Sequence, residues 1–365
     1  MKILHVITTL DVGGAERLMV DLLPLLKSYG DEIDLLLFNG KETLFKKELE
    51  SKGITVYGLS SQEGFADHRE VNNPLNILRL RKYLNHYEII HTHNTACQFY
   101  VPLASKIFHS NAKKVTTEHS SNNRRRSKWW FKPIDKWMYS QYDAIISIAD
   151  QARLNLVKYI GTSLNNVCTI CNGVDTNRFI RPIKDITNQK SFVVTMIAGY
   201  RNEKDHETVL RAISLLPGNY HLILVGRGEK ESKLKSYCKE LGIDSRVTFM
   251  GPRMDVPSVL EASDINVLSS HWEGLSLSSV EGMASGRPFI ASDVEGLREV
   301  VGGAGVLFPH EDEKALADAI KKLCEDPIYY RDVAISCQQR AQNYDVSKMA
   351  EEYHTLYESI LKSSN

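Results

Sequence analysis

The chain has 365 residues, in which 45 lysines and arginines balance 45 aspartates and glutamates. This length predicts roughly two domains, because a single hydrophobic core rarely serves more than about 250–300 residues. The balanced charge excludes a global electrostatic field that would draw the protein onto nucleic acid or membrane, so any such partner must be recognised by a local patch.

The N-terminal run MKILHVITTL lacks the apolar region and cleavage site of a signal peptide. No run in the sequence reaches the roughly 18 apolar residues that span a bilayer. The six cysteines are too few for a disulfide scaffold in so long a chain. We therefore expect a cytoplasmic protein.

Short β-branched runs alternate with amphipathic helical stretches along the first half of the chain. Strands are expected at KILHVIT, IDLLLF, ITVYGL, EIIHTH, KKVTTEH, DAIISIA and VCTICN. Helices are expected at residues 15–30, 74–86 and 151–161, among others. Strand, helix and strand in succession predict a parallel, doubly wound α/β sheet, which gives a Rossmann-like first domain over residues 1–172.

The same alternation begins again after a polar stretch at 173–190, which is the expected linker. Strands are expected at SFVVTMIAG, HLILVG, RVTFMG, INVLSS, PFIASD and GVLFP, in a second Rossmann-like domain over residues 191–344. The terminal segment 345–365 predicts a helix with one apolar face, expected to return and dock on the first domain. Two such sheets facing each other would form a cleft at the carboxyl ends of their strands.

The stretch HWEGLSLSSVEGMASG places two carboxylates, Glu273 and Glu281, around the expected start of a helix. Gly274 lets the backbone approach a ligand, and the unpaired amides at a helix start suit a phosphate. Carboxylates bind sugar hydroxyls well, so the combination predicts a nucleotide sugar. The alternative is a capping box formed by Ser278 and Glu281, in which both side chains satisfy the helix's own amides.

Two further segments follow expected strands. MIAGYRNEKDHE carries Arg201 and Lys204, cations suited to a diphosphate leaving group, although a solvated surface is the alternative. LDVGGAERLM carries Gly13 and Gly14, which suit a phosphate cradle or a plain tight turn. Neither this segment nor VGRGEKES has the third glycine of a dinucleotide fingerprint, so oxidoreductase chemistry is disfavoured, and a tight turn is the preferred interpretation of the latter.

Histidines end two of the expected strands, His119 in KKVTTEH and His91 and His93 in EIIHTH. Such a histidine could hydrogen-bond a sugar or carry a proton, and a structural role is the alternative, favoured for His91. The sequence shows no D-x-D motif and no cluster of ligands at metal spacing. We therefore expect neither a metal nor a cofactor.

The stretch SSNNRRRSKWWFKPIDKWMY interleaves cations with tryptophans. Such a composition suits an anionic membrane interface or a lipid pyrophosphate, and no nucleic-acid-binding module accompanies it. A solvated loop that covers an apolar helix is the alternative. The residues of the candidate acceptor or membrane patch are Arg124, Arg125, Arg126, Lys128, Trp129 and Trp130.

Together these segments resemble glycosyltransferase family 4, whose members are retaining nucleotide-sugar transferases with the GT-B fold. The resemblance covers DVGGAER, TTEH, NGVDTNRF, RNEKDHE, VGRGEK and the long run from VLSSHWEG to EGLREVV, in which the two glutamates match the E-x7-E signature. The resemblance implies that Glu273 binds the donor sugar's hydroxyls and Glu281 the ribose. It also implies that Lys204 binds the diphosphate.

Further roles follow from the same resemblance. It assigns the distal phosphate and the sugar to the amides of Leu275, Ser276 and Leu277. It places His119 beside the donor sugar and acceptor, and it brings the Gly13–Gly14 turn to the same place.

The chain departs from the family pattern at two positions. Many members carry an arginine where this chain has Gly199, and Arg201 is the expected substitute for that charge. Ser278 stands where a proline is common, which favours the capping-box alternative.

The expected function is transfer of a sugar from a UDP- or GDP-sugar to a glycan or lipid-linked acceptor in bacterial surface polysaccharide or glycolipid assembly, with peripheral contact to the inner face of the membrane. The alternatives are a nucleotide-sugar epimerase, and a non-enzymatic membrane or nucleic-acid binding protein that uses residues 124–137.

Overall fold

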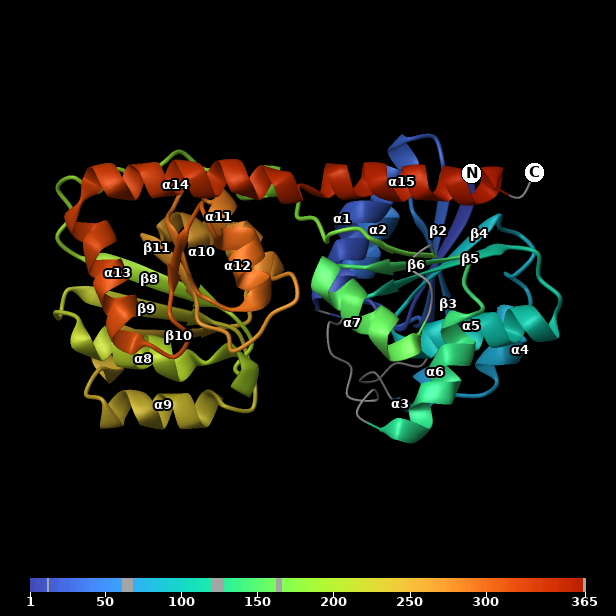
Figure 1. The fold of residues 1–365 in the computed structure, drawn as a ribbon, viewed down its shortest axis with the longest axis horizontal. Helices are drawn as coiled ribbons and strands as arrows, with labels where there is room; N and C mark the ends of the chain where they lie inside the picture. The colour runs from blue at the N-terminus through green and yellow to red at the C-terminus, as the bar shows by residue number, and fades with distance from the viewer. Residues whose placement is uncertain (12, 61–67, 120–127, 162–165, 364–365) are drawn as a thin grey trace. The chain divides into compact units, whose positions relative to one another are not determined.

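The computed structural model describes residues 1–11, 13–60, 68–119, 128–161 and 166–363. These residues form two compact units (Figure 1). The first consists of Met1–Gly173 together with Val346–Asn365, and the second of Val174–Asp345. All thirteen strands expected from the sequence are present, and every strand pair is parallel.

The first unit is built on a seven-stranded sheet of order β3-β2-β1-β4-β5-β6-β7. The strands are β1 (Lys2–Ile7), β2 (Glu32–Asn39), β3 (Thr55–Ser60), β4 (Ile89–His93), β5 (Lys113–Glu118), β6 (Ala144–Ser147) and β7 (Val167–Thr169). The helices are α1 (Gly14–Ser28), α2 (Leu44–Ser51), α3 (His68–Val71), α4 (Asn76–Leu80), α5 (Thr95–Ile107), η2 (Trp129–Phe131), α6 (Lys132–Tyr139), α7 (Asp150–Ile160) and α15 (Val346–Lys362).

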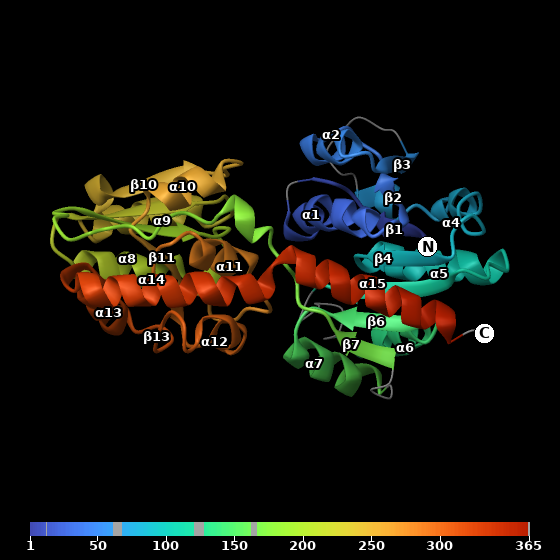
Figure 2. The same cartoon turned by 90° about the horizontal axis from the view of Figure 1, so that it is seen from above.

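Side chains of the first sheet alternate between its two faces, as the pleat of a strand requires. Ile3 and Ile7 of β1 pack in one core with α1, α2 and α15, whereas Leu4 and Val6 pack in a second core with α4 and α5. Seen from above, α15 crosses the strands of this sheet (Figure 2). Its buried residues include Met349, so the terminal helix docks on the first unit as the sequence predicted.

The second unit contains a six-stranded sheet of order β10-β9-β8-β11-β12-β13. The strands are β8 (Phe192–Ile197), β9 (Tyr220–Val225), β10 (Val247–Gly251), β11 (Ile265–Leu268), β12 (Phe289–Ser292) and β13 (Val306–Phe308). The helices are η4 (Thr176–Arg178), η5 (Asn202–Lys204), α8 (His206–Leu215), α9 (Glu231–Glu240), η6 (Asp244–Arg246), α10 (Val256–Ala262), α11 (Leu277–Ala284), α12 (Glu295–Val301), α13 (Glu313–Glu325), α14 (Pro327–Ala341) and η7 (Gln342–Tyr344).

Two segments differ from the sequence expectation. Residues 174–190, for which a linker was expected, pack on the second unit, because Phe179 and Ile186 are buried in its core. The helix expected over 74–86 ends at Leu80. Beyond it the chain continues in tighter turns, with the amide of Tyr83 donating to Leu80 O at 2.9 Å, an i→i+3 bond that replaces the α-helical pattern.

Candidate active site

The strand order of the second sheet identifies where a ligand is expected. The chain passes from β8 outward to β9 and β10, and then returns to place β11 on the other side of β8. Ligands of open parallel sheets bind at the carboxyl ends of the strands that flank such a reversal. The two segments at this position are those that follow β8 and β11.

The segment after β8 is held in place by the end of β11. Ser269 Oγ donates hydrogen bonds to Lys204 O at 3.1 Å and to Asp205 O at 2.8 Å. The amide of His271 donates to Glu203 O at 2.8 Å. These bonds fix the short helix η5, and with it the position from which the Lys204 side chain extends.

The structure brings Lys204 and Glu273 together as an ion pair, although 69 positions separate them in sequence. Their side chains are 20% and 12% exposed, so the pair is largely shielded from water. Ser270 Oγ donates to the same carboxylate at 2.8 Å, a contact that sequence reasoning missed. An opposite charge held in this way gives each partner a fixed orientation at the reversal point.

The helix α11 begins at Leu277, a short loop after Glu273, with Ser276 as its N-cap residue. Amides at the start of a helix and just before it have no partner within the helix, so those of Leu275, Ser276 and Leu277 are suited to an anion. The helix packs unusually close to the sheet, because a Cβ atom on Gly282 would lie 2.6 Å from the Phe289 ring.

The capping-box alternative for Ser278 and Glu281 requires Ser278 as the N-cap residue, and the structure places Ser276 in that position. The helix starts one residue before Ser278, and its N-cap residue makes no side-chain cap bond. Glu281 is consequently the fifth residue of α11 and lies beyond its first turn. Glu281 as a whole is partly buried.

Arg201 occupies the neighbourhood of Gly199, the position at which the family pattern carries an arginine. A Cβ atom on Gly199 would lie 3.3 Å from Arg201 Nε. The Arg201 side chain is 66% exposed, and its guanidinium lies 3.7 Å from the carboxylate of Glu203.

The glycines of VGRGEKES allow close backbone packing, since a Cβ on Gly226 would lie 2.1 Å from Ala198 O.

Two of the sequence-predicted site elements belong to the first unit. Gly13 is the N-cap residue of α1, and the carboxylate of Glu16 reaches back to within 2.2 Å of where its Cβ would lie. His119 follows β5, and its Nε2 lies 3.0 Å from Nδ1 of His93. Burial lowers the pKa of His119 to about 4, so its imidazole is neutral at physiological pH.

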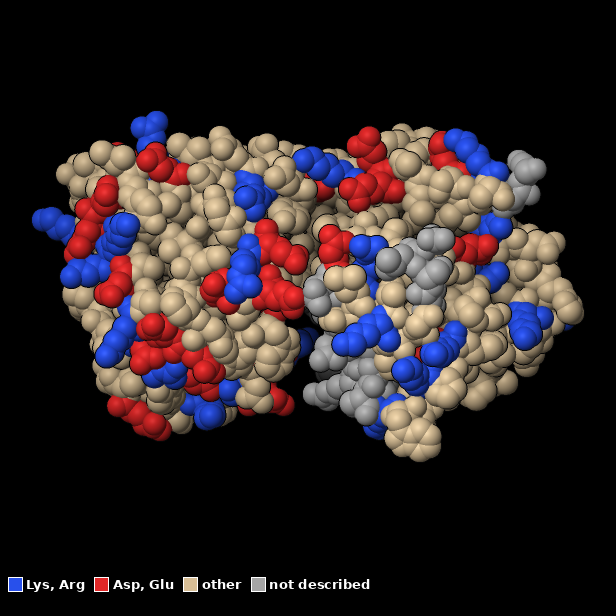
Figure 3. All heavy atoms as spheres, viewed as in Figure 1, with Lys and Arg blue, Asp and Glu red and all other residues tan. Residues whose placement is uncertain are grey.

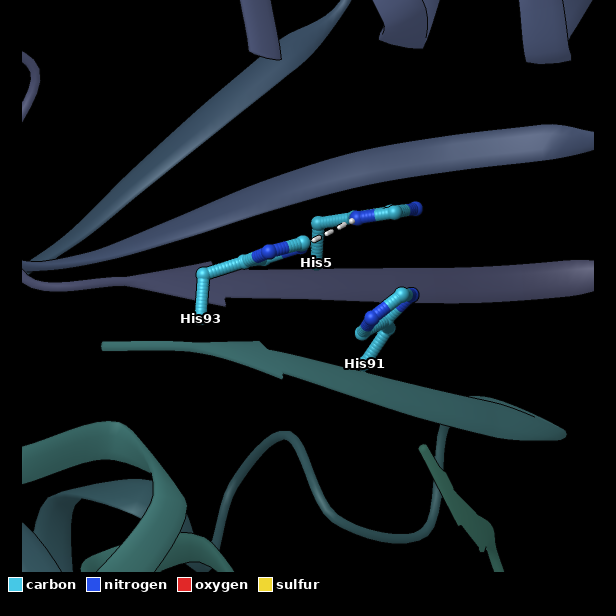
Figure 4. A group of neighbouring side chains, drawn as sticks. All are labelled: His5, His91 and His93. Carbon is cyan, nitrogen blue, oxygen red and sulfur yellow. Dashed lines mark hydrogen bonds between the residues drawn. The ribbon is translucent and has the colours of Figure 1, made fainter. Parts of the chain in front are cut away.

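The fold also gathers histidines that lie far apart in sequence. His5, His91 and His93 are fully buried and project into one region (Figure 4). One nitrogen atom from each lies within 4.8 Å of the other two, which is close enough for the three to share a metal ion. A second group with the same spacing of possible ligand atoms consists of His271, His310 and Glu311. The sequence analysis found no ligand cluster, because strand pairing rather than sequence spacing brings these side chains together. A lone histidine in the apolar strand KILHVIT was the available signal.

Three residues of the basic-aromatic patch, Arg124, Arg125 and Arg126, lie outside the described residues. Lys128, Trp129 and Trp130 are exposed at the start of η2, with the two indoles 86% and 49% exposed. Among the described helices, none combines the length and the apolar character that crossing a bilayer requires.

Comparison with known proteins decides the family. The sequence model of "Glycosyltransferase Family 4" matches residues 12–178, and that of "Glycosyl transferases group 1" matches residues 178–342. The chain belongs to glycosyltransferase family 4. Family 4 membership makes the protein a glycosyl-transferring enzyme, which excludes the non-enzymatic alternative and disfavours the epimerase.

Relatives of this family 4 chain include two curated bacterial enzymes. One is the α-1,4-N-acetyl-D-galactosaminyltransferase of Campylobacter jejuni that acts on an undecaprenol-diphosphate-linked glycan, 26% identical over 99% of each chain. The other is the lipopolysaccharide core glycosyltransferase LpsD of Rhizobium meliloti, 26% identical over 90% of this chain and 89% of that one.

Solved structures show the same fold. HepE of Anabaena, crystallised with UDP-glucose, has a TM-score of 0.83 at 23% identity and covers 98% of this chain and 100% of its own. The sucrose-phosphate synthase of Thermosynechococcus elongatus has a TM-score of 0.80 at 19% identity and covers 99% of each chain. The family 4 protein therefore has the GT-B fold, with two Rossmann-like parallel-sheet domains.

Proposed function

We propose that the protein is a retaining glycosyltransferase that moves a sugar from a UDP-sugar to a hydroxyl of a lipid-linked or glycan acceptor, in the assembly of bacterial surface polysaccharide or glycolipid. The observation that carries the proposal is the Lys204–Glu273 pair beside the first amides of α11, at the strand reversal of the second sheet. The acceptor class is supported by the names of the two curated relatives, and UDP by the crystallised HepE complex.

In the proposed donor site, each charged group binds one part of the nucleotide sugar. The Lys204 ammonium binds the diphosphate, and the amides of Leu275, Ser276 and Leu277 bind the distal phosphate and sugar. Glu273 accepts hydrogen bonds from the donor sugar's hydroxyls, and Glu281 accepts them from the ribose. Arg201 adds positive charge near the diphosphate in place of the arginine missing at Gly199.

The ion pair suggests how the site handles charge during the reaction. Before the donor binds, Glu273 neutralises Lys204, and the diphosphate takes over that role when it arrives. As the bond to the anomeric carbon breaks, negative charge grows on the phosphate that Lys204 and the helix amides contact. We propose that these groups supply the stabilisation without a metal ion, and that the acceptor attacks from the leaving-group side, with the departing phosphate oxygen taking its proton.

We assign two elements of the first unit to the same reaction. His119 binds the donor sugar or the acceptor, and the Gly13–Gly14 turn contributes backbone amides. Both assignments rest on the family resemblance and on the positions of these residues after β5 and β1, at the carboxyl edge of the first sheet.

A second part of the proposal concerns the surface at η2 and α6. Lys128, Lys132 and Lys136 are exposed there, whereas Asp135 is buried. On the face shown in Figure 3, lysine and arginine predominate over acidic residues around α6. Exposed indoles beside cations suit an anionic lipid surface. We propose that this surface rests on the cytoplasmic face of the membrane, where a lipid-linked acceptor would be found.

The test is a donor screen by thermal unfolding followed by an assay of transfer. A donor present at 100 times its dissociation constant stabilises the protein by about 2.7 kcal/mol, so UDP-glucose, UDP-galactose, UDP-N-acetylglucosamine, GDP-mannose and ADP-glucose are compared in parallel. We expect a UDP-sugar to raise the midpoint temperature of thermal unfolding. We also expect release of UDP only when bacterial lipid extract is added as the source of acceptor. Release of an epimerised nucleotide sugar without acceptor, or no response to any donor, would contradict the proposal.

A further inference from the structure

A continuous series of hydrogen bonds runs through the interior of the first unit, between the sheet and α15. Its members, which we call the histidine chain, are in order of contact His119, His93, His5, Tyr357, His91, Thr117 and Tyr353. The six links between them measure 3.0, 3.0, 3.4, 2.5, 2.8 and 2.9 Å in that order. The series thus joins a candidate site residue to the terminal helix.

The direction of each link depends on its neighbours. Burial lowers the pKa of His5 to about 3 and holds the pKa values of His91 and His93 well below their usual range, so these imidazoles are neutral. A neutral imidazole has one N–H donor and one acceptor nitrogen. Because these three use both nitrogens within the histidine chain, the direction of one link fixes that of the next.

The direction is set at Tyr353, which is fully buried. Within the described residues its hydroxyl has one partner, Thr117 Oγ1. If the tyrosine only accepted, its own hydrogen would lack an acceptor among the described residues at a fully buried position, at a cost of about 1–3 kcal/mol. Tyr353 therefore donates to Thr117, and the threonine hydrogen goes to Nε2 of His91.

The remaining directions follow from one end to the other. His91 carries its hydrogen on Nδ1 and donates to Tyr357, whose hydroxyl donates to Nε2 of His5. His5 then donates from Nδ1 to His93. His93 in turn donates from Nδ1 to Nε2 of His119. If every link ran in the opposite direction, the Tyr353 hydrogen would be unpaired. If Tyr357 donated to His91 instead, then His91 and Tyr353 would both donate to Thr117, and the Thr117 hydrogen would be unpaired.

We infer that α15 sets the tautomer of His119, which is held as a neutral imidazole with its hydrogen on Nδ1 and offers substrate a hydrogen-bond donor rather than a general base. The tautomer follows from the hydrogen bonds alone. Only the part concerning substrate rests on the proposed function. The other six members act through His119 and are positioning residues.

The tautomer is measured directly by long-range proton–nitrogen NMR of the full-length chain at neutral pH. The His119 resonances are identified by their loss in His119→Asn. We expect a protonated Nδ1 and an unprotonated Nε2. A protonated Nε2, or an imidazolium, overturns the inference. So does a stoichiometric metal in the purified protein, since a metal-bound imidazole nitrogen accepts no hydrogen bond.

A pair of variants tests whether α15 is responsible. Tyr353→Phe removes the hydroxyl that fixes the direction, so a second His119 tautomer should appear. Equal populations would lower kcat/KM about twofold, because half the molecules would be competent. The matched control is Tyr142→Phe, which removes a buried hydroxyl bonded to Thr92 and to Gln98 O, outside the histidine chain. An unchanged tautomer in Tyr353→Phe, or an equal change in the control, refutes the role of the helix.

A second pair tests what His119 does for the substrate. An asparagine amide lies near the position of Nδ1 and a glutamine amide near that of Nε2, so His119→Asn should retain about tenfold more kcat than His119→Gln. The opposite order overturns the donor role. If no donor supports transfer while wild-type His119 still shows a protonated Nδ1, the proposed function fails and the tautomer assignment stands.

Discussion

Replacing Lys204 with alanine separates the stability of the empty site from its activity. The Lys204–Glu273 pair is 20% and 12% exposed, which places it between an exposed pair worth about 0–1 kcal/mol and a buried one whose disruption costs about 3–5 kcal/mol. We therefore expect Lys204→Ala to lose about 1–2 kcal/mol of unfolding free energy. In a unit of this size the melting temperature should fall by about 2–8 °C.

The loss of activity should be much larger than this loss of stability implies. Removing one group that stabilises the leaving charge costs about 3–4 kcal/mol, so kcat should fall by roughly 10²–10³-fold. The assay is release of the nucleoside diphosphate from the donor identified by the thermal screen, measured below the melting temperature of both proteins.

Lys184→Ala is the matched control. Lys184 lies 2.5 Å from the buried carboxylate of Asp264, at the amino end of β11 and therefore at the opposite edge of the same sheet. This variant should lose stability and keep near-normal turnover. Turnover of Lys204→Ala within about threefold of wild type, or equal losses in the two variants, would refute the assignment of the lysine to the diphosphate.

Three further outcomes are expected. Gly282→Ala should lower the unfolding free energy measured in urea by about 1–3 kcal/mol, because its Cβ meets the Phe289 ring. Gly218→Ala is the control and should not lower it, since its Cβ would meet nothing within 4 Å. Equal urea midpoints for the two variants would contradict the close packing. The double variant Trp129→Ala/Trp130→Ala should sediment less with anionic vesicles, whereas Trp272→Ala, at another exposed tryptophan, serves as the control. Unchanged vesicle binding by the double variant would refute the proposed membrane-binding surface.

The third concerns pH. Lowering the pH from about 6.5 to about 5.5 should cost about 1 kcal/mol for each histidine in Figure 4, since only the unfolded state takes up these protons. The folded pKa values are depressed, so this stability is fully present above about pH 6.5 and lost as the pH falls. Urea midpoints at both pH values test it, and His5→Gln should show a flatter dependence.

The strands were predictable because each is a short β-branched run with polar breaks, and the parallel pairing follows from the helices between them. The local sequence pattern was less informative about where helices begin and end, because tertiary packing determines those boundaries. The helix expected over 74–86 stops at Leu80 because tight turns continue the chain into the core. The capping-box alternative implied that Ser278 is the N-cap residue of α11, two residues after the observed Ser276, because both serines are acceptable N-cap residues by composition.

The candidate site shows the same division. Lys204 and Glu273 were each proposed from local sequence, but their pairing depends on β8 and β11 being neighbours, which strand order alone reveals. The histidine chain was beyond sequence reasoning, because its members come from β1, β4, β5, the residue after β5, and α15. His5 and Tyr357, for example, lie 352 positions apart.

The docking of α15 on the first unit has a consequence for synthesis. On the ribosome, β1 through β7 emerge long before α15, which packs in the same apolar core as Ile3, Ile7 and Val115. These apolar residues of the nascent first unit therefore lack their helical cover until translation is nearly finished. Any translation product that stops short of α15 leaves these residues uncovered and deprives His5 and His91 of the Tyr357 hydroxyl that both contact. Premature termination should therefore yield insoluble product even though both sheets are encoded in full.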